Sequence, residues 1–126
     1  TVVHLVSTVS AQLRSGVSWS EIINATFPPG SVSGAPKFTA LKMINDLEPT
    51  ARGPYCGAIG AVDADAVTAK LAVGIRTFWL TGDRGHKVLH FGTGAGITWG
   101  SDPEAEWEES ELKARHLTSV AAGVWT

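Results

Sequence analysis

The sequence predicts an α+β fold, in which antiparallel strands are flanked by helices. Segments with helical capping patterns or helical apolar spacing occur in the first half of the chain and at its end, and most of the strand-like segments, rich in β-branched and aromatic residues, are grouped between them. Such grouping, without strict alternation of strand and helix, is typical of the α+β class. The 126 residues are enough for one small module, and 44% of them are hydrophobic against 17% charged, as in chains that fold.

The first part of the chain is predicted to hold a strand and a short helix. Thr1–Ser7 is β-branched and apolar apart from His4, which predicts a buried strand. Ser18 is followed three residues later by Glu21, a capping-box pattern that starts a helix. The helix is expected to end before the Phe-Pro-Pro-Gly sequence at 27–30, because these residues break helices.

A second helix is predicted over Lys37–Leu47, after a loop of small residues at 31–37. Leu41 and Ile44 recur at the three-residue spacing of an amphipathic helix, and Pro36 suits its first turn. Three strand-like runs follow: Tyr55–Val62, Ala69–Leu80 and Lys87–Thr93. A glycine-containing loop at 81–85 predicts a hairpin between the last two of these runs.

The chain is predicted to end in a long helix, Pro103–Ala121, that Asp102 and Pro103 open. Acidic residues stand in its first turns and basic ones further along, which matches the helix macrodipole. Glu106, Glu109 and Lys113 are spaced so that they share one face. Paired carboxylates one turn apart can bind Mg²⁺, but the same spacing also fits a solvated face with a Glu–Lys pair.

Charge and composition argue against several classes of partner. Ten Lys and Arg against twelve Asp and Glu give a net charge of −2. The chain therefore lacks the excess of positive charge that is typical of proteins that bind nucleic acid or an anionic membrane. No apolar run approaches the roughly 18 residues of a membrane-spanning helix. The one cysteine, Cys56, excludes an internal disulfide and is expected to be a small buried hydrophobe. We therefore expect a cytoplasmic protein without a nucleic-acid or membrane partner.

Isolated polar residues and glycines leave alternatives open. His4 could transfer protons near neutral pH or be a hydrogen-bonded histidine in the core. Arg76 ends an alternating apolar strand, where it could clamp a carboxylate or simply lie on the surface. Gly94 and Gly96 mark either a close approach to a ligand or turns. The Gly94-Ala95-Gly96 segment lacks the third glycine of a dinucleotide-binding fingerprint.

Read together, the motifs occur in the order that characterises one enzyme family. They are HLVS (4–7), FPPGSVSGAPK (27–37), LEP with RGPYCGAIG (47–60), IRT (75–77), GAGI (94–97) and SDPEAEWEE (101–109). In these strings the chain resembles the chorismate-utilising enzymes from residue 2 to about 117. That superfamily includes the large subunits of anthranilate synthase and aminodeoxychorismate synthase. RGPYCGAIG and IRTFW look most like aminodeoxychorismate synthase component I.

The resemblance implies roles for residues at a metal and at the reacting carbon. His4 would lie over the ring carbon of chorismate that loses its hydroxyl and would assist that departure. Glu109 would bind Mg²⁺ directly, with Glu106 beside it. Lys113 would help to neutralise the chorismate carboxylate on the metal side. These roles suit a dianionic substrate, whose burial needs compensating positive charge.

The resemblance also implies how the rest of the substrate is bound. Arg76 would hold the carboxylate of the enolpyruvyl arm, with Tyr55 nearby and the amides of Gly94 and Gly96 donating to it. A loop of three residues would line the ring pocket: Ser33, Gly34 and Ala35. The fold implied is the C-terminal part of the chorismate-binding fold.

The implied reaction replaces the 4-hydroxyl of chorismate with an amine, toward p-aminobenzoate and folate. Ammonia would come from glutamine through an amidotransferase subunit (component II). Anthranilate synthase component I, which aminates carbon 2 and eliminates pyruvate, is the alternative within the superfamily. A non-catalytic binding or structural module is the alternative outside it.

The family's catalytic domain is several times longer than this chain, and a Pro-Ile-Lys-Gly-Thr motif that carries a catalytic lysine in aminodeoxychorismate synthases is absent here. We therefore expect residues 1–126 to be the C-terminal segment of a longer catalytic domain. That segment would hold about half of a site, complete only with the N-terminal part of the same chain. Alone it is expected to be inactive.

Overall fold

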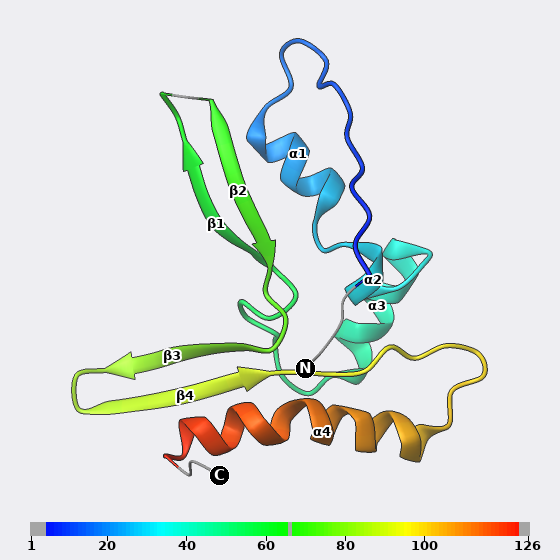
Figure 1. The fold of residues 1–126 in the computed structure, drawn as a ribbon, viewed down its shortest axis with the longest axis vertical. Helices are drawn as coiled ribbons and strands as arrows, with labels where there is room; N and C mark the ends of the chain where they lie inside the picture. The colour runs from blue at the N-terminus through cyan, green and yellow to red at the C-terminus, as the bar shows by residue number, and fades with distance from the viewer. Residues whose placement is uncertain (1–4, 66, 124–126) are drawn as a thin grey trace.

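The computed structural model describes residues 5–65 and 67–123, and it confirms the α+β class (Figure 1). Within these described ranges, four helices and four strands follow one another in the order α1 (Trp19–Thr26), α2 (Gly30–Ser33), α3 (Lys37–Leu47), β1 (Ala58–Asp63), β2 (Thr68–Val73), β3 (Thr77–Asp83), β4 (His86–Gly92) and α4 (Pro103–Ala121).

The strands form two antiparallel hairpins. β1 pairs with β2 from Ala58 opposite Val73 to Asp63 opposite Thr68. β3 pairs with β4 from Thr77 opposite Gly92 to the turn at Asp83 and His86, as the glycine-containing loop predicted. Within the described residues the hairpins are separate two-stranded sheets, and they extend in different directions from a shared junction (Figure 1). α4 runs alongside the β3–β4 hairpin.

The prediction of one strand over Ala69–Leu80 is wrong, because the run divides into β2 and β3. Arg76 has a φ of +47°, in the left-handed region, which interrupts regular strand geometry. This conformation costs a non-glycine residue roughly 1–2 kcal/mol, and it turns the chain from one hairpin into the other. The Thr77 hydroxyl donates to the Ile75 carbonyl at 3.0 Å across the same bend.

The predicted helices form where their local signals place them. In α1 the Ser18 amide donates to a Glu21 carboxylate oxygen at 2.9 Å, and the Glu21 amide donates back to Ser18 Oγ at 3.3 Å. α3 occupies the predicted range with Pro36 directly before it. α4 begins at Pro103, and Asp102 accepts a hydrogen bond from the Ala105 amide at 3.0 Å.

Two expectations for the first part of the chain fail. Residues 5–7 of the predicted strand have no regular secondary structure and are exposed, and its remaining residues lie outside the described part. The predicted loop at 31–37 begins as the short helix α2. Backbone hydrogen bonds after Pro29 explain this helix, since the Ser33 and Gly34 amides donate to the carbonyls of Pro29 and Gly30 at 3.1 and 2.8 Å.

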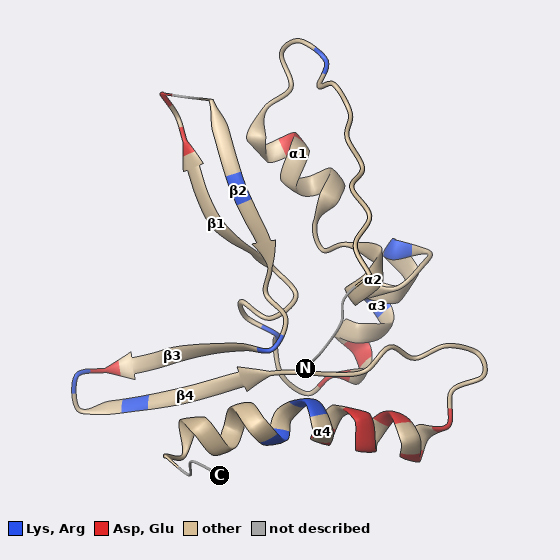
Figure 2. Cartoon of the chain, in the orientation of Figure 1, with Lys and Arg blue, Asp and Glu red and all other residues tan. Residues whose placement is uncertain are grey.

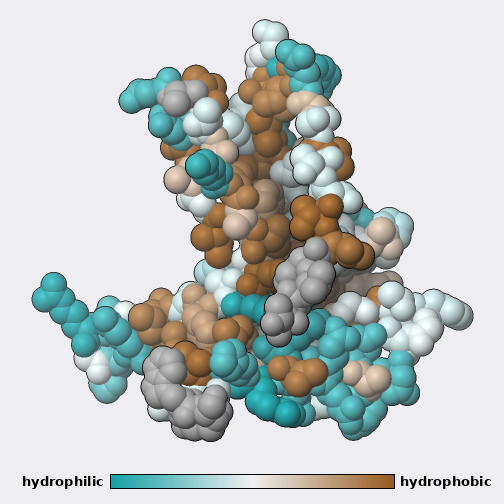
Figure 3. Space-filling view, in the orientation of Figure 1, coloured by the Kyte–Doolittle hydropathy of each residue, from teal (hydrophilic) through white to brown (hydrophobic). Residues whose placement is uncertain are grey.

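The described residues share almost no apolar core. Cys56, 6% exposed, is the only hydrophobic side chain among them that is buried, as predicted for it, and Ser33 is the only buried polar one. Large side chains such as Phe38 and Trp99 are exposed. Figure 3 shows apolar surface gathered over α1 and the β1–β2 hairpin, whereas the surface over α4 is mainly hydrophilic. Local hydrogen bonds therefore hold the elements more than side-chain packing does.

Among the residues that the structure describes, no helix combines the length and apolar character needed to cross a membrane.

Replacing Ser18 with Ala is expected to weaken α1 by about 1 kcal/mol, because the N-cap hydroxyl then no longer satisfies a free helical amide. Hydrogen exchange of the α1 amides is the measurement. Ser20→Ala, a substitution at an exposed position within the same helix, is the matched control. Equal exchange in the two variants would contradict the capping assignment.

Candidate functional site

Tyr55 lies against two glycines at the end of β4. A Cβ atom at Gly92 would lie 2.5 Å from Tyr55 Cγ, and one at Gly94 would lie 2.9 Å from the phenolic oxygen. Because real Cβ atoms almost never approach so closely, these positions require glycine while the ring keeps its place. The structure thus brings Tyr55 and Gly94, both predicted site residues, into direct contact.

Lys113 extends this cluster onto α4. Its ammonium group donates to the Gly94 carbonyl at 3.2 Å and forms an ion pair with Glu109, one turn earlier on the helix. Figure 2 shows the acidic residues of α4 gathered in its first half and the basic ones in its second half. Four predicted site residues therefore form one continuous group around Gly94: Tyr55, Gly94, Glu109 and Lys113. We refer to them as the Gly94 cluster.

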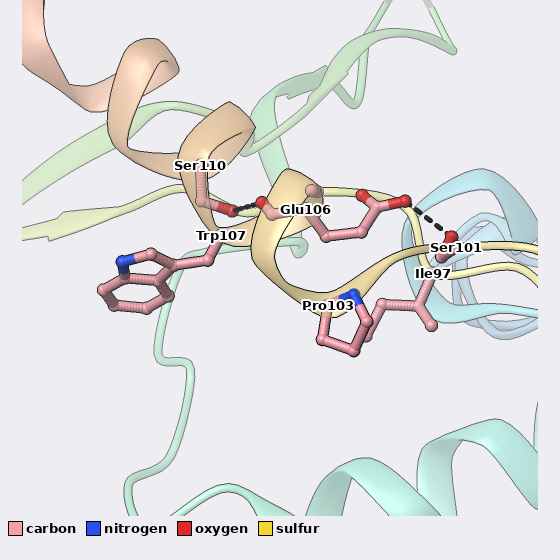
Figure 4. A pocket seen from close by; sticks show the side chains of 7 residues that line it. Ile97, Ser101, Pro103, Glu106, Trp107 and Ser110 are labelled. Atoms are coloured by element: carbon pink, nitrogen blue, oxygen red, sulfur yellow. Dashed lines mark hydrogen bonds between the residues drawn. The ribbon is translucent and has the colours of Figure 1, made fainter.

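Glu106 is fixed by a residue that the sequence did not single out as functional. The Ser101 hydroxyl donates to a Glu106 carboxylate oxygen at 2.5 Å, and the Thr98 amide donates to Ser101 Oγ at 2.9 Å (Figure 4). Glu106 and Ser101 line a cavity of about 270 Å³, together with Ala95, Ile97, Pro103, Trp107 and Ser110. The Glu106 carboxylate thus faces the loop that precedes α4, and the Glu109 carboxylate pairs with Lys113, which reaches the same loop at Gly94.

The predicted ring-pocket residues lie at the end of α2. Ser33 is 8% exposed, and its hydroxyl donates to the Pro29 carbonyl at 3.0 Å. Gly34 has a φ of +104°, and a Cβ there would lie 3.0 Å from the Cβ of Ala40 in α3. Ala35 follows and is exposed. In this structure the Ser33 hydroxyl is therefore used by the backbone.

Arg52, which no sequence pattern singled out as a site residue, connects this loop to the Gly94 cluster. The guanidinium makes a bidentate interaction with the Glu48 carboxylate, in which Nε donates at 2.8 Å and Nη2 at 2.5 Å. Its Nη1 lies 3.4 Å from both the Val32 carbonyl and Cys56 Sγ. The same group lies over the Tyr55 ring, 5.6 Å from its centroid.

These contacts shift two pKa values in opposite directions. Burial, with a further contribution from the adjacent Cys56 thiol, raises the pKa of Tyr55 to about 12. The hydrogen bonds from Arg52 hold the pKa of Glu48 below its usual value. Near neutral pH, Tyr55 is therefore a neutral hydrogen-bond donor and Glu48 is an anion that neutralises Arg52.

The structure does not join every predicted residue to this cluster. Arg76 lies exposed at the bend between β2 and β3. Gly96 is also exposed, and a Cβ there would meet no atom within 4 Å. His4 lies outside the described residues.

A wider groove separates the β3–β4 hairpin from α4, with a volume of about 780 Å³. Tyr55, Trp79, Phe91 and Trp107 line it, and the ring of Trp79 stacks on His90 with centroids 5.1 Å apart. Thr93 also lines the groove, and its hydroxyl is buried without a hydrogen-bond partner in the described chain. The groove thus combines an aromatic lining with an unused polar group.

The carboxylates of α4 have the donor chemistry that Mg²⁺ prefers. Mg²⁺ is usually bound through one or two carboxylates, while water and substrate oxygens complete its shell. Glu106 and Glu109 can supply two such ligands one turn apart, and the side chain of Glu109 is half exposed. No group of three or more His, Cys, Asp or Glu side chains with metal-site geometry occurs within 5–65 and 67–123. The described chain therefore supplies at most part of a metal shell.

The fold and this cluster define an α+β segment with paired carboxylates, a lysine and close-packed glycines. A family profile described as chorismate binding enzyme matches residues 1–119. The chain belongs to the chorismate-binding enzyme family.

Curated relatives match nearly the whole chain. It is 42% identical to "Anthranilate synthase component 1" of Saccharolobus solfataricus over 121 residues, which are 96% of this chain and 27% of the relative. It is 39% identical over 120 residues to the protein of that name in Neisseria meningitidis serogroup B, covering 95% and 23% of the two chains. The chain is also 44% identical to the Synechocystis protein of that name over 118 residues, which are 92% of this chain and 23% of the relative.

The chain therefore spans about a quarter of the length of these relatives. The resemblance to chorismate-utilising enzymes is confirmed. The finer prediction of aminodeoxychorismate synthase is not supported by these relatives, whose names are those of the predicted alternative.

The raised pKa of Tyr55 predicts that its phenol ionises near pH 12 and not near pH 10. Since the folded chain holds the proton more tightly than the unfolded chain, this contribution to stability is complete below pH 10 and is lost as the pH rises through 12. Tyrosinate absorbance measures the ionisation directly, because Tyr55 is the one tyrosine.

Tyr55→Phe is the control for this titration, and it is expected to abolish the signal. A midpoint near pH 10 in the wild-type chain would mean that the ring does not occupy its half-buried place against Gly92.

Proposed function

We propose that this chain forms part of a chorismate-converting enzyme of the anthranilate synthase component 1 type. The observation that carries the proposal is the family match over residues 1–119. The names of the relatives favour anthranilate as the product over aminodeoxychorismate. The Gly94 cluster supports the proposal, since its lysine and phenol offer donors to an anionic substrate.

In this proposal the residues of the chain bind a dianion and offset the cost of removing its two carboxylates from water. Lys113 supplies a positive charge and Tyr55 a neutral phenolic donor on either side of Gly94. Arg76 would clamp the second carboxylate through paired N–H groups, and the amides of Gly94 and Gly96 would donate to it. The loop of Ser33, Gly34 and Ala35 would contact the ring.

Glu106 and Glu109 would hold Mg²⁺, which would neutralise a substrate carboxylate and stabilise negative charge on the departing hydroxyl. Lys113 forms an ion pair with Glu109 in this structure. If Glu109 bound a cation instead, the Lys113 ammonium group would be released from that pair and could contact a substrate carboxylate. His4 would give a proton to the departing hydroxyl. A glutamine amidotransferase subunit is proposed as the source of ammonia for the whole enzyme.

Aminodeoxychorismate synthase component I is the second candidate function. The strings RGPYCGAIG at 52–60 and IRTFW at 75–79 favour it. In that case the product is 4-amino-4-deoxychorismate, and the chain would serve p-aminobenzoate and folate synthesis.

Product identity separates the two candidates. The natural polypeptide that contains this sequence, given chorismate, ammonia and Mg²⁺, is expected to release anthranilate and pyruvate. Chromatography with mass detection makes the measurement. Accumulation of 4-amino-4-deoxychorismate would favour the second candidate, and consumption of no chorismate would contradict both.

Binding tests whether the chain retains part of the site. Titration of the chain with chorismate in the presence of Mg²⁺ is expected to release heat in a calorimeter. Glu109→Gln is expected to weaken binding at least about tenfold, since it removes one carboxylate ligand and its charge.

Glu108→Gln is the matched control, because it removes an exposed acid from the adjacent position of the same helix. Identical heat from both variants, or none from the wild-type chain, would favour a structural module without a ligand.

A further inference from the structure

We propose that Arg52 is a positioning residue that holds the 30–35 segment, which comprises α2 and the two residues after it, and Tyr55 in one fixed arrangement. The inference rests on the proposed function, because these two segments are its candidate ring-binding and carboxylate-binding parts. Arg52 itself is not assigned a contact with substrate.

The anchoring of Arg52 begins at Glu48. Two parallel N–H···O contacts, at 2.8 and 2.5 Å, fix the plane of the guanidinium against the carboxylate. Arg52 is 25% exposed and Glu48 is 38% exposed, so the pair is partly shielded from water. With that plane fixed, the remaining nitrogen, Nη1, has a defined direction.

Nη1 points to the two segments that flank the guanidinium. It donates to the Val32 carbonyl of α2, one residue before Ser33, and to Cys56 Sγ, one residue after Tyr55, at 3.4 Å in each case. The cationic face also lies over the Tyr55 ring, a favourable position for a cation–π contact. One side chain thus touches both candidate parts of the substrate site.

The position of Tyr55 matters because there is little space around it. Its ring is confined by Gly92 and its hydroxyl by Gly94, so a small displacement moves the phenolic donor away from the Gly94 cluster. The Ser33 and Gly34 backbone is held by the hydrogen bonds of α2 and by its packing against Ala40 of α3, and Arg52 ties it in addition to the 52–56 turn. Lysine has the same charge but lacks the planar fork that makes these contacts at once.

The first test measures how often this arrangement opens. Cys56 is the one cysteine of the chain and is buried, so its rate of modification by a thiol reagent reports opening of the 52–56 turn. Arg52→Ala is expected to raise that rate at least about tenfold, and Arg52→Lys to raise it less, because hydrogen bonds to charged groups stabilise strongly.

Arg84→Ala is the matched control, since it removes an exposed arginine from the β3–β4 turn. Its labelling rate should equal that of the wild-type chain, and circular dichroism should show the same helix content in all variants. Unchanged labelling of Cys56 in Arg52→Ala would overturn the inference, whatever the protein's activity.

The second test separates positioning from a purely structural role. In the natural polypeptide, Arg52→Lys is expected to raise the KM for chorismate about tenfold with kcat within about twofold, as for loss of uniform binding. Faster labelling of Cys56 with an unchanged KM would overturn the positioning role. A wild-type protein that does not consume chorismate would contradict the proposed function instead, and the labelling test would still decide whether Arg52 holds the turn.

Discussion

The position of α4 depends on two polar contacts with the loop that precedes it. Lys113 reaches the Gly94 carbonyl, and Glu106 accepts a hydrogen bond from Ser101. The helix buries no side chain among the described residues, so these contacts and the N-cap at Asp102 orient it. The carboxylates proposed to hold a cation are therefore the same groups that, directly or through Lys113, fix the helix. A cation bound by these carboxylates would replace Ser101 and Lys113 as their partners, and the fold would not have to change.

These polar contacts orient α4, but they contribute little to the free energy of unfolding of the chain. A partly exposed ion pair such as Lys113–Glu109 contributes about 0.2–1 kcal/mol, whereas full burial of one large apolar side chain contributes about 1.5–3 kcal/mol. Phe38, Ile97 and Trp99 are all exposed in this structure. Most of the stability that these residues could provide thus depends on contacts beyond those the described chain makes. The relatives, about four times as long, contain more polypeptide that could make such contacts.

Local chemistry made the helices predictable. The Ser18–Glu21 capping box, the Asp102-Pro103 start and the helical spacing in α3 all act within a few residues, and each appears where expected. The break at Arg76 could not be predicted, because its positive φ follows from the placement of two hairpins. In the candidate site, helical spacing predicted that Glu109 and Lys113 share a face of α4, and the two form an ion pair there. Arg52 was missed because its pair with Glu48 lies beyond the end of α3, where helix-face spacing no longer applies.

Within the proposed function, charge balance gives a physical reason for a cation to accompany the substrate. Arg52 and Glu48 neutralise one another. The other charged side chains proposed to bind the substrate and the cation are Lys113 and Arg76, the latter not joined to the Gly94 cluster in this structure, against Glu106 and Glu109, and these also balance. Addition of a dianion would leave the site with two uncompensated negative charges, which a partly shielded pocket disfavours. One divalent cation restores neutrality. Ionisation of Tyr55 would instead add negative charge, and its raised pKa keeps the phenol neutral. Within the proposed function, substrate and cation should therefore each strengthen the binding of the other.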